Sequence, residues 1–128
     1  MLENVLLEEN RGTISSGLGG SKNRLKFFLL ISSTTEEPFT KNQIELINEE
    51  FDLVCQEHDC RIEANDFEKN YATMKILVPL DVAVGYVIEQ GIDGCNKMDH
   101  FLSSTYYFTN VKIPSQQELS ELIREIKE

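Results

Sequence analysis

The stretch RIEANDFEKNYATMKILV, residues 61–78, decides the fold of this sequence. In its first part Ile62 and Ala64 fall on one face of an expected strand, with a charged residue between them, which is typical of a half-buried strand. In its last part polar and apolar residues alternate again, and the apolar set is Ala72, Met74, Ile76 and Val78. The residues FEKN between the two parts predict a turn. The stretch is therefore expected to form a β-hairpin that ends at Pro79.

A helix is expected before this hairpin. Thr40, with Gln43 three residues later, forms a capping box, which marks the start of a helix over residues 41–58. Apolar residues recur along it at steps of three and four, so that one face holds Ile44, Ile47, Phe51, Val54 and His58. The acidic residues of this segment lie mostly outside that face.

A second helix is expected after the hairpin. Asp81 is suited to cap it, and Gly91 is suited to the left-handed position that ends it. Gly85 lies inside the expected helix, where glycine costs about 1 kcal/mol relative to alanine. We therefore expect close packing against a neighbour at that point.

Two further strands and a terminal helix complete the pattern. The apolar run LKFFLLIS, residues 25–32, precedes the first helix, and STYYFTNVKI, residues 104–113, follows the second. Ser115 and Glu118 form another capping box ahead of an amphipathic terminal helix. The order β-α-β-β-α-β predicts an α+β, ferredoxin-like, two-layer sandwich with an extra C-terminal helix and a flexible N-terminal arm.

The chain of 128 residues suits one domain, which we expect over residues 25–128. Residues 1–24 are expected to hold a short first element, with Leu2, Val5 and Leu6 at helical spacing, and a Gly/Ser-rich arm. The N-terminus carries acids where an export signal would carry bases, and no apolar run reaches the roughly 20 residues of a membrane-spanning helix. Three cysteines, an odd number, then favour reduced thiols and a cytoplasmic location without a membrane partner.

Net charge is −10, from 22 acidic and 12 basic residues. This balance opposes binding to phosphate backbones, so nucleic acid is not expected as a partner. A basic protein is the heterologous partner that such a charge would suit. The apolar residues on both faces of segment 25–32 also indicate that something covers the second face of the sheet. The terminal helix, residues 2–9 or a second copy of the chain could do so, and we expect self-association as a homodimer or larger oligomer, to which the terminal elements contribute.

The residues CQEHDC, positions 55–60, hold three of the five soft metal ligands in the chain, namely Cys55, His58 and Cys60. Structural zinc needs about four ligands within roughly 2.3 Å of one point. The other two, Cys95 and His100, follow the second expected helix, which runs opposite to the first. The two groups are therefore expected at opposite ends of the molecule, and no metal site is predicted. Cys55, His58 and Cys60 remain weak candidates.

The segment KNYATMKI, residues 69–76, resembles the third-strand signature of the RNA-recognition motif, in which a basic residue precedes alternating aromatics on an open sheet face. Tyr71 fits one stacking position of that family. Thr73 and Ile76 stand where the family has aromatics, and Asn70 replaces its glycine. The resemblance implies a degenerate domain of this type as one alternative.

No nucleophile lies beside a base in the sequence, and no pair of carboxylates marks a catalytic pocket. Neither a catalytic residue nor a cofactor is predicted. Whether the chain is an enzyme stays open, and the sequence favours a protein that is not one. The sequence thus favours a small, acidic, non-catalytic regulatory or protein-interaction module that self-associates through its sheet. The main alternative is a ligand-binding or enzymatic domain with its site at a subunit interface.

Overall fold

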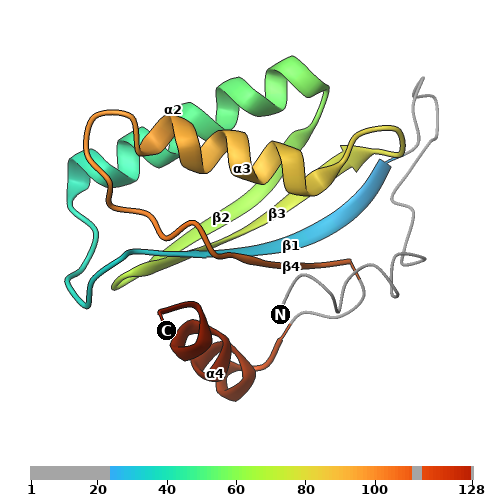
Figure 1. Cartoon of the computed structure of the whole chain (residues 1–128). Helices are drawn as coiled ribbons and strands as arrows, with labels where there is room; N and C mark the ends of the chain where they lie inside the picture. Colours follow the sequence, from blue (N-terminus) through green and yellow to red (C-terminus); the bar gives the residue numbers. More distant parts are fainter. Residues whose placement is uncertain (1–23, 111–113, 128) are drawn as a thin grey trace.

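The computed structural model of this chain describes residues 24–110 and 114–127. The expected element at residues 2–9, nearly all of the expected arm and the end of the expected fourth strand lie outside the described residues. The elements follow the order β1 (Arg24–Ser32), α2 (Lys41–His58), β2 (Arg61–Glu68), β3 (Tyr71–Pro79), α3 (Val84–Cys95), β4 (Tyr107–Thr109) and α4 (Gln116–Lys127). Helices α2 and α3 cover one face of the sheet and α4 lies against the other (Figure 1). No helix of the described residues is long and apolar enough to cross a membrane.

The sheet has four antiparallel strands in the order β2-β3-β1-β4. The central pair, β1 and β3, is in register over nine residues, from Arg24 opposite Pro79 to Ser32 opposite Tyr71. The helices that follow these two antiparallel strands therefore run in opposite directions, as expected. The α+β, ferredoxin-like order with an extra C-terminal helix is confirmed.

Helix α2 begins where its capping box predicts. The Gln43 backbone N–H donates to Thr40 Oγ1 at 3.1 Å, and the Thr40 backbone N–H donates to Gln43 Oε1 at 2.9 Å. These two bonds satisfy backbone donors that a helix N-terminus otherwise leaves unpaired. The helix ends at Asp59, whose φ of 64° is left-handed. Ile47, Phe51 and Val54 are buried on the predicted face.

Strand β2 departs from the predicted alternation. A β-bulge between Ile62 and Ala64 inserts Glu63 as an extra residue, so Ile62 pairs with Ile76 while Ala64 pairs with Lys75. Ile62 therefore faces the helices and Ala64 faces the opposite side, and the prediction that they share a face is wrong. Period-two alternation assumes an unbroken ladder, which a bulge interrupts.

Helix α3 also differs from its prediction. It begins after Ala83, without a side-chain cap, and it continues through Gly91 to Cys95. Gly91 does not end the helix. It lies where α2 packs closely on α3, and its missing side chain leaves room for this contact. A Cβ built at Gly91 would lie 2.6 Å from the Phe51 ring, and one at Gly94 would meet the end of the Glu50 side chain. The close helix contact is thus at these glycines, and a Cβ at Gly85 meets only the Tyr106 hydroxyl at 3.3 Å.

Within the described part of the expected fourth strand, residues 104–110, regular pairing with β1 covers Tyr107–Thr109. Before it, Leu102 forms a single bridge with Ser33. Asn96 holds this irregular segment from the end of α3. Its Oδ1 accepts the backbone N–H groups of Phe101 and Leu102, each at 3.0 Å, and its Nδ2 donates to the Leu102 carbonyl at 2.9 Å. An asparagine side chain here replaces ladder hydrogen bonds.

The sheet separates two apolar cores. The larger one lies between the sheet and helices α2 and α3, and it includes Leu29, Ile31, Phe51, Met74, Ile76 and Ile88. The smaller one lies on the other face, where Phe28 and Leu30 of β1 pack with Ile126 of α4. Leu30 is fully buried there. The apolar residues on both faces of β1 are thus covered within one chain, and the cover of the second face is α4.

Candidate functional site

Among the residues that the structure describes, the second face of the sheet is only partly covered. Helix α4 packs over the β1 and β4 side of it, against Phe28, Leu30, Tyr71 and Tyr107. Its apolar face, formed by Leu119, Leu122, Ile123 and Ile126, supplies the contact. Apart from Tyr71 at the start of β3, the β2 and β3 side of the same face lies beyond this contact. We call the exposed part formed by β2 and β3 the open half-face.

A pocket of about 330 Å³ lies on the open half-face. Its lining residues are Phe28, Ala64, Asn65, Asp66, Thr73, Met74 and Lys75. Register explains this grouping, because Ala64 pairs with Lys75 and Asp66 pairs with Thr73 across the β2-β3 ladder. Directly paired residues share a face and lie close together. The bulge at Glu63 is what turns Ala64 and Asp66 toward this side.

The polar groups of this pocket differ in what they can bind. Lys75 carries an ammonium that donates to anions, the Thr73 hydroxyl can donate or accept, and the Asp66 carboxylate accepts. Glu63, in the bulge, forms an ion pair with Lys26 through Oε1 and Nζ at 3.1 Å. The Asn65 side chain points the other way and donates to Asn48 Oδ1 of α2 at 2.7 Å. The pocket can thus hold an anionic group beside a hydrogen-bond donor.

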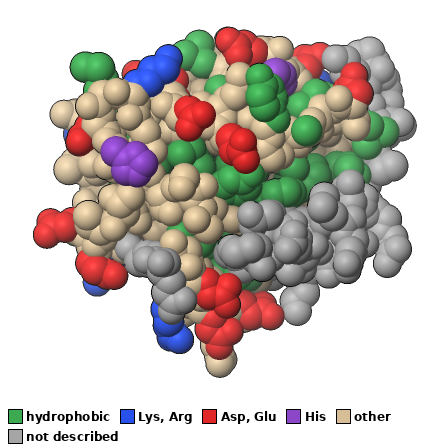
Figure 2. Space-filling view, in the orientation of Figure 1, with side chains coloured by type: hydrophobic (Ala, Val, Ile, Leu, Met, Phe, Trp, Pro, Cys, Tyr) green, Lys and Arg blue, Asp and Glu red, His purple; other side chains and the backbone are tan. Residues whose placement is uncertain are grey.

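Charge is unevenly distributed between the two layers. Within their bounds, α2 and α3 carry seven carboxylates and a single lysine, Lys41. The four strands carry four basic residues, Arg24, Lys26, Arg61 and Lys75, against three acidic ones. Figure 2 shows Asp and Glu side chains spread over the helical layer and over α4. The strongly negative surface is therefore helical, while the sheet is close to neutral.

The segment that resembles the RNA-recognition motif is split between the two faces. Tyr71 and Thr73 point to the side of α4 and the pocket, while Ile76 lies in the larger core. Tyr71 is half-buried under α4 rather than free for stacking. Burial, with the nearby Glu68 carboxylate, raises the pKa of the Tyr71 hydroxyl above its usual value. This phenol is therefore neutral around pH 7 and is not an activated nucleophile.

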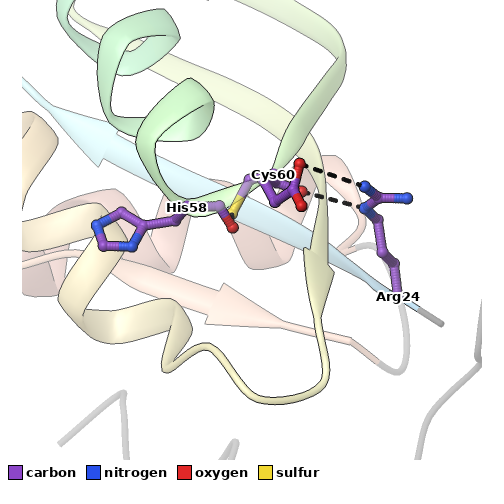
Figure 3. A network of polar contacts seen from close by, with 4 residues as sticks. Arg24, His58 and Cys60 are labelled. Atoms are coloured by element: carbon purple, nitrogen blue, oxygen red, sulfur yellow. Dashed lines mark hydrogen bonds and ion pairs between the residues drawn. The ribbon is translucent and has the colours of Figure 1, made fainter. Parts of the chain in front are cut away.

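The three weak metal candidates lie at the junction of α2 and β2, but the His58 side chain points away from the two cysteines. The His58 ring packs on Tyr86 with centroids 5.6 Å apart, and its Nε2 lies 2.8 Å from Gln90 Oε1 in α3. Cys60 Sγ lies on the other side, 3.8 Å from the His58 carbonyl oxygen (Figure 3). Within residues 24–110 and 114–127, no group of three or more His, Cys, Asp or Glu side chains is placed to hold a metal ion.

Cys95, from the second group of soft ligands, lies far from the first. Its Sγ is 3.9 Å from the carbonyl oxygen of Leu46 in α2. Leu46 precedes Cys55 by nine residues, which is about 13 Å along a helix at 1.5 Å per residue. Burial, with the Glu50 carboxylate nearby, raises the pKa of the Cys95 thiol to about 12. This cysteine is a core residue in the structure.

Two solved structures are similar to this fold. One is a candidate transposase from Deinococcus radiodurans R1, with a TM-score of 0.63 and 8% identity, over 89% of this chain and 96% of that one. Another is the REP-associated tyrosine transposase bound to a REP hairpin, with a TM-score of 0.59 and 8% identity, over 80% of this chain and 64% of that one. Neither a family model nor a curated protein matches the sequence. At this identity the likeness establishes a shared fold.

These likenesses contradict two interpretations drawn from the sequence. The non-catalytic, acidic protein-interaction module is wrong, because the solved structures that share the fold are transposases. The exclusion of nucleic acid is wrong as well, because one of them is bound to a REP hairpin. Self-association stays a prediction, and α4 covers the apolar half of the sheet face on which it was based. The net charge of the chain was misleading because it averages two layers of different charge. A count of charged residues in each predicted helix and strand would have shown the difference.

Proposed function

We propose that this chain binds nucleic acid on the open half-face, with a DNA hairpin as the first candidate ligand. The observation that carries the proposal is the shared fold with two transposase structures, one of which holds a REP hairpin. A cytoplasmic location, which we also propose, gives the thiols of the chain the reducing surroundings in which they stay free.

The distribution of charge supports this surface over the others. A phosphate backbone is repelled by the carboxylates of α2 and α3, and interactions beyond about 8–10 Å are largely screened at physiological salt. The sheet face is close to neutral and presents Lys75 in a pocket. A nucleic acid that approaches from this side meets a lysine while the carboxylates of α2 and α3 lie across the sheet. On this side α4 carries Glu118, Glu121 and Glu125. Net charge of the chain therefore matters less than the charge of this face.

The pocket supports a specific division of roles. Its volume of about 330 Å³ is at the small end of the roughly 300–1,000 Å³ of ligand pockets, which suits a single unpaired nucleotide. In the proposed complex Lys75 contacts a phosphate. Asp66 accepts a hydrogen bond from an exocyclic amino group, as acidic side chains do from cytosine. An unpaired base at a hairpin loop or bulge can enter such a pocket, whereas a paired base stays stacked in the duplex.

The test is a titration of the full chain against a fluorescently labelled DNA hairpin, with a perfect duplex of the same stem as competitor, followed by anisotropy. The variant is Lys75→Glu, and the matched control is Lys41→Glu, which makes the same charge change at the start of α2. We expect Lys75→Glu to weaken binding by about tenfold or more. The slope of log affinity against log salt concentration should fall in magnitude by about one, as expected for the loss of one phosphate contact. Lys41→Glu should change affinity much less.

Two results would contradict the proposal. One is the absence of saturable binding to the hairpin at low salt, where phosphate contacts are strongest. The other is an equal loss of affinity in Lys75→Glu and Lys41→Glu, which would show that only overall charge matters. Incubation of the hairpin with the wild-type chain, followed by denaturing electrophoresis, would show in the same preparation whether binding leads to strand cleavage.

A further inference from the structure

The junction between α2 and β2 holds two cysteines in a defined backbone motif. Asp59, in the left-handed conformation, donates its backbone N–H to the Gln56 carbonyl at 3.5 Å. Cys60 donates its backbone N–H to the Cys55 carbonyl at 2.8 Å. This pair of bonds is the Schellman motif, in which the residue after the left-handed position commonly contacts the residue five positions before it. Here both contacting residues are cysteines.

The two thiols lie together at the edge of the larger core. Cys55 is buried, and Cys60, half-buried, packs against the same cluster. Each thiol is the largest influence on the pKa of the other. With the Cys60 N to Cys55 O distance of 2.8 Å, standard covalent geometry keeps the two Cα atoms within about 6.7 Å. Disulfides usually span Cα distances of about 4.4–6.8 Å, so the backbone suits one without rearrangement.

The surroundings shift the pKa values of the two thiols in opposite directions. The hydrogen bond from Cys55 lowers the pKa of Cys60, and Arg24 of β1 lowers it further, against burial and the Asp59 carboxylate. The same hydrogen bond, burial and the Asp52 carboxylate raise the pKa of Cys55. Arg24 is held at this corner by Asp59, with its Nε donating to the Asp59 carbonyl at 3.2 Å and Nη2 3.9 Å from Oδ1 (Figure 3). Cys60 is therefore the attacking thiol and Cys55 the buried partner.

We propose that Cys55 and Cys60 form a reversible dithiol-disulfide site that is oxidised by a low-molecular-weight disulfide such as glutathione disulfide. The Cys60 thiolate attacks one sulfur of the disulfide, whose S–S bond breaks, and the leaving thiolate takes up a proton. The Cys55 thiol then loses its proton to solvent and attacks Cys60 Sγ, which releases the second small thiol. Two protein thiols lose two electrons and two protons, and the small disulfide becomes two thiols. The proposal is independent of nucleic-acid binding.

Intact protein and its tryptic peptides test this proposal. The reduced chain is equilibrated in buffers of graded glutathione to glutathione-disulfide ratio, quenched with acid, alkylated and digested. Trypsin places Cys55 and Cys60 together in peptide 42–61 and Cys95 in peptide 76–97, because no lysine or arginine lies inside either peptide. We expect peptide 42–61 to lack two hydrogen atoms while Cys95 is fully alkylated. Cleavage after Glu57, which lies between the two cysteines, should leave the halves joined until a reductant is added.

A synthetic peptide of residues 42–61 serves as the unfolded reference. Because the folded chain holds the thiols in contact, we expect its disulfide to form at a glutathione-disulfide level at least about tenfold lower than in the peptide. The proposal would be overturned if the folded chain needed a glutathione-disulfide level equal to or higher than that of the peptide to form its disulfide. So would a mixed disulfide on Cys60 that never resolves in the wild-type chain.

Two single substitutions separate the roles of the cysteines. Cys60→Ser should leave Cys55 unreacted with glutathione disulfide, and Cys55→Ser should accumulate a stable mixed disulfide on Cys60. Circular dichroism of each reduced variant checks that it is folded. If Cys55→Ser shows no mixed disulfide although it is folded, Cys60 is not the attacking thiol and the proposed order of steps is wrong. If both variants are unfolded, the comparison of wild-type chain and peptide still decides the proposal.

Discussion

At the scale of single residues, Gly91 determines how closely the two helices of the first layer approach. The position has ordinary helical backbone, so its importance lies in the missing side chain and not in an unusual φ. The Phe51 ring, fully buried, occupies the space that a Cβ at Gly91 would need. The sequence shows a glycine inside an apolar helix but not which neighbour fills the gap, because that depends on how α2 and α3 are paired.

We expect Gly91→Ala to lower the free energy of unfolding by about 1–3 kcal/mol, the usual cost of overpacking a well-packed core. This cost outweighs the gain of up to about 1 kcal/mol in helix propensity. Urea unfolding followed by circular dichroism measures the change. Gly85→Ala is the matched control, because its Cβ would meet only the Tyr106 hydroxyl at 3.3 Å. An equal loss of stability in both variants would show that the Phe51 contact does not limit this position.

The cysteines allow a prediction about pH. The pKa of Cys60 is lowered and that of Cys95 is raised to about 12, so Cys60 holds the larger thiolate fraction at any pH below that value. Since the thiolate is the nucleophile, alkylation of Cys60 should rise with pH earlier than that of Cys95. A pulse of iodoacetamide at graded pH, read out on peptides 42–61 and 76–97, measures both rates in one sample. Cys95 reacting first at pH 7–8 would contradict this reading of the two environments.

At the scale of elements, the two capping boxes located the starts of α2 and α4, whereas the single cap residue predicted for α3, Asp81, did not cap it. Period-two alternation located the faces of strands less well. Both capping boxes are present, at Thr40 and at Ser115, because their bonds join residues only three positions apart. The end of α3 was missed because Gly91 has a tertiary role, and the facing of Ala64 was missed because a bulge interrupts β2. The pocket depends on that bulge, so the sequence could not assemble it.

The cap of α4 should contribute measurably to the cover of the second sheet face. Ser115→Ala removes the Oγ that accepts the Glu118 backbone N–H at 3.2 Å, and we expect a loss of about 1 kcal/mol in unfolding free energy. Ser120→Ala is the control in the same helix, because the Ser120 hydroxyl donates only to the Gln116 carbonyl. That substitution should be neutral or slightly stabilising, since alanine favours helix interiors. A smaller effect at Ser115 than at Ser120 would mean that the capping box does not hold α4.

At the scale of the whole molecule, the two layers differ in charge, and this difference explains why composition pointed away from nucleic acid. The order of strands and helices was predictable from local patterns, and so was the need for a cover on the second sheet face. Which segment covers it was not predictable, because α4, the N-terminal segment and a second chain were all apolar candidates. The structure shows α4 there, packed on Phe28 and Leu30.

If nucleic acid binds the sheet side, the helical carboxylates act on it only over a distance. We therefore expect the double substitution Glu45→Gln and Glu49→Gln, on exposed positions of α2, to tighten hairpin binding by a few fold at about 0.01 M salt. The effect should vanish near 0.15 M, because the screening length falls from about 30 Å to about 8 Å. Anisotropy titrations at the two salt concentrations measure it. An undiminished effect at the higher concentration would place the ligand on the helices instead.

The extra residue at position 63 reverses the alternation of inward and outward side chains within the edge strand β2. Before it, Ile62 contributes to the interior; after it, Ala64 and Asp66 are displayed to the outside. Deleting that one residue would remove the bulge and leave Ile62 opposite Ile76 and Ala64 opposite Lys75, so both faces of the strand would keep their side chains. A strand that kept all its residues but paired without a bulge would instead turn Asp66 towards the hydrophobic interior and take one wall from the pocket around Lys75. The bulge thus lets the chain carry one additional amino acid while the burial of the core and the pocket are both preserved.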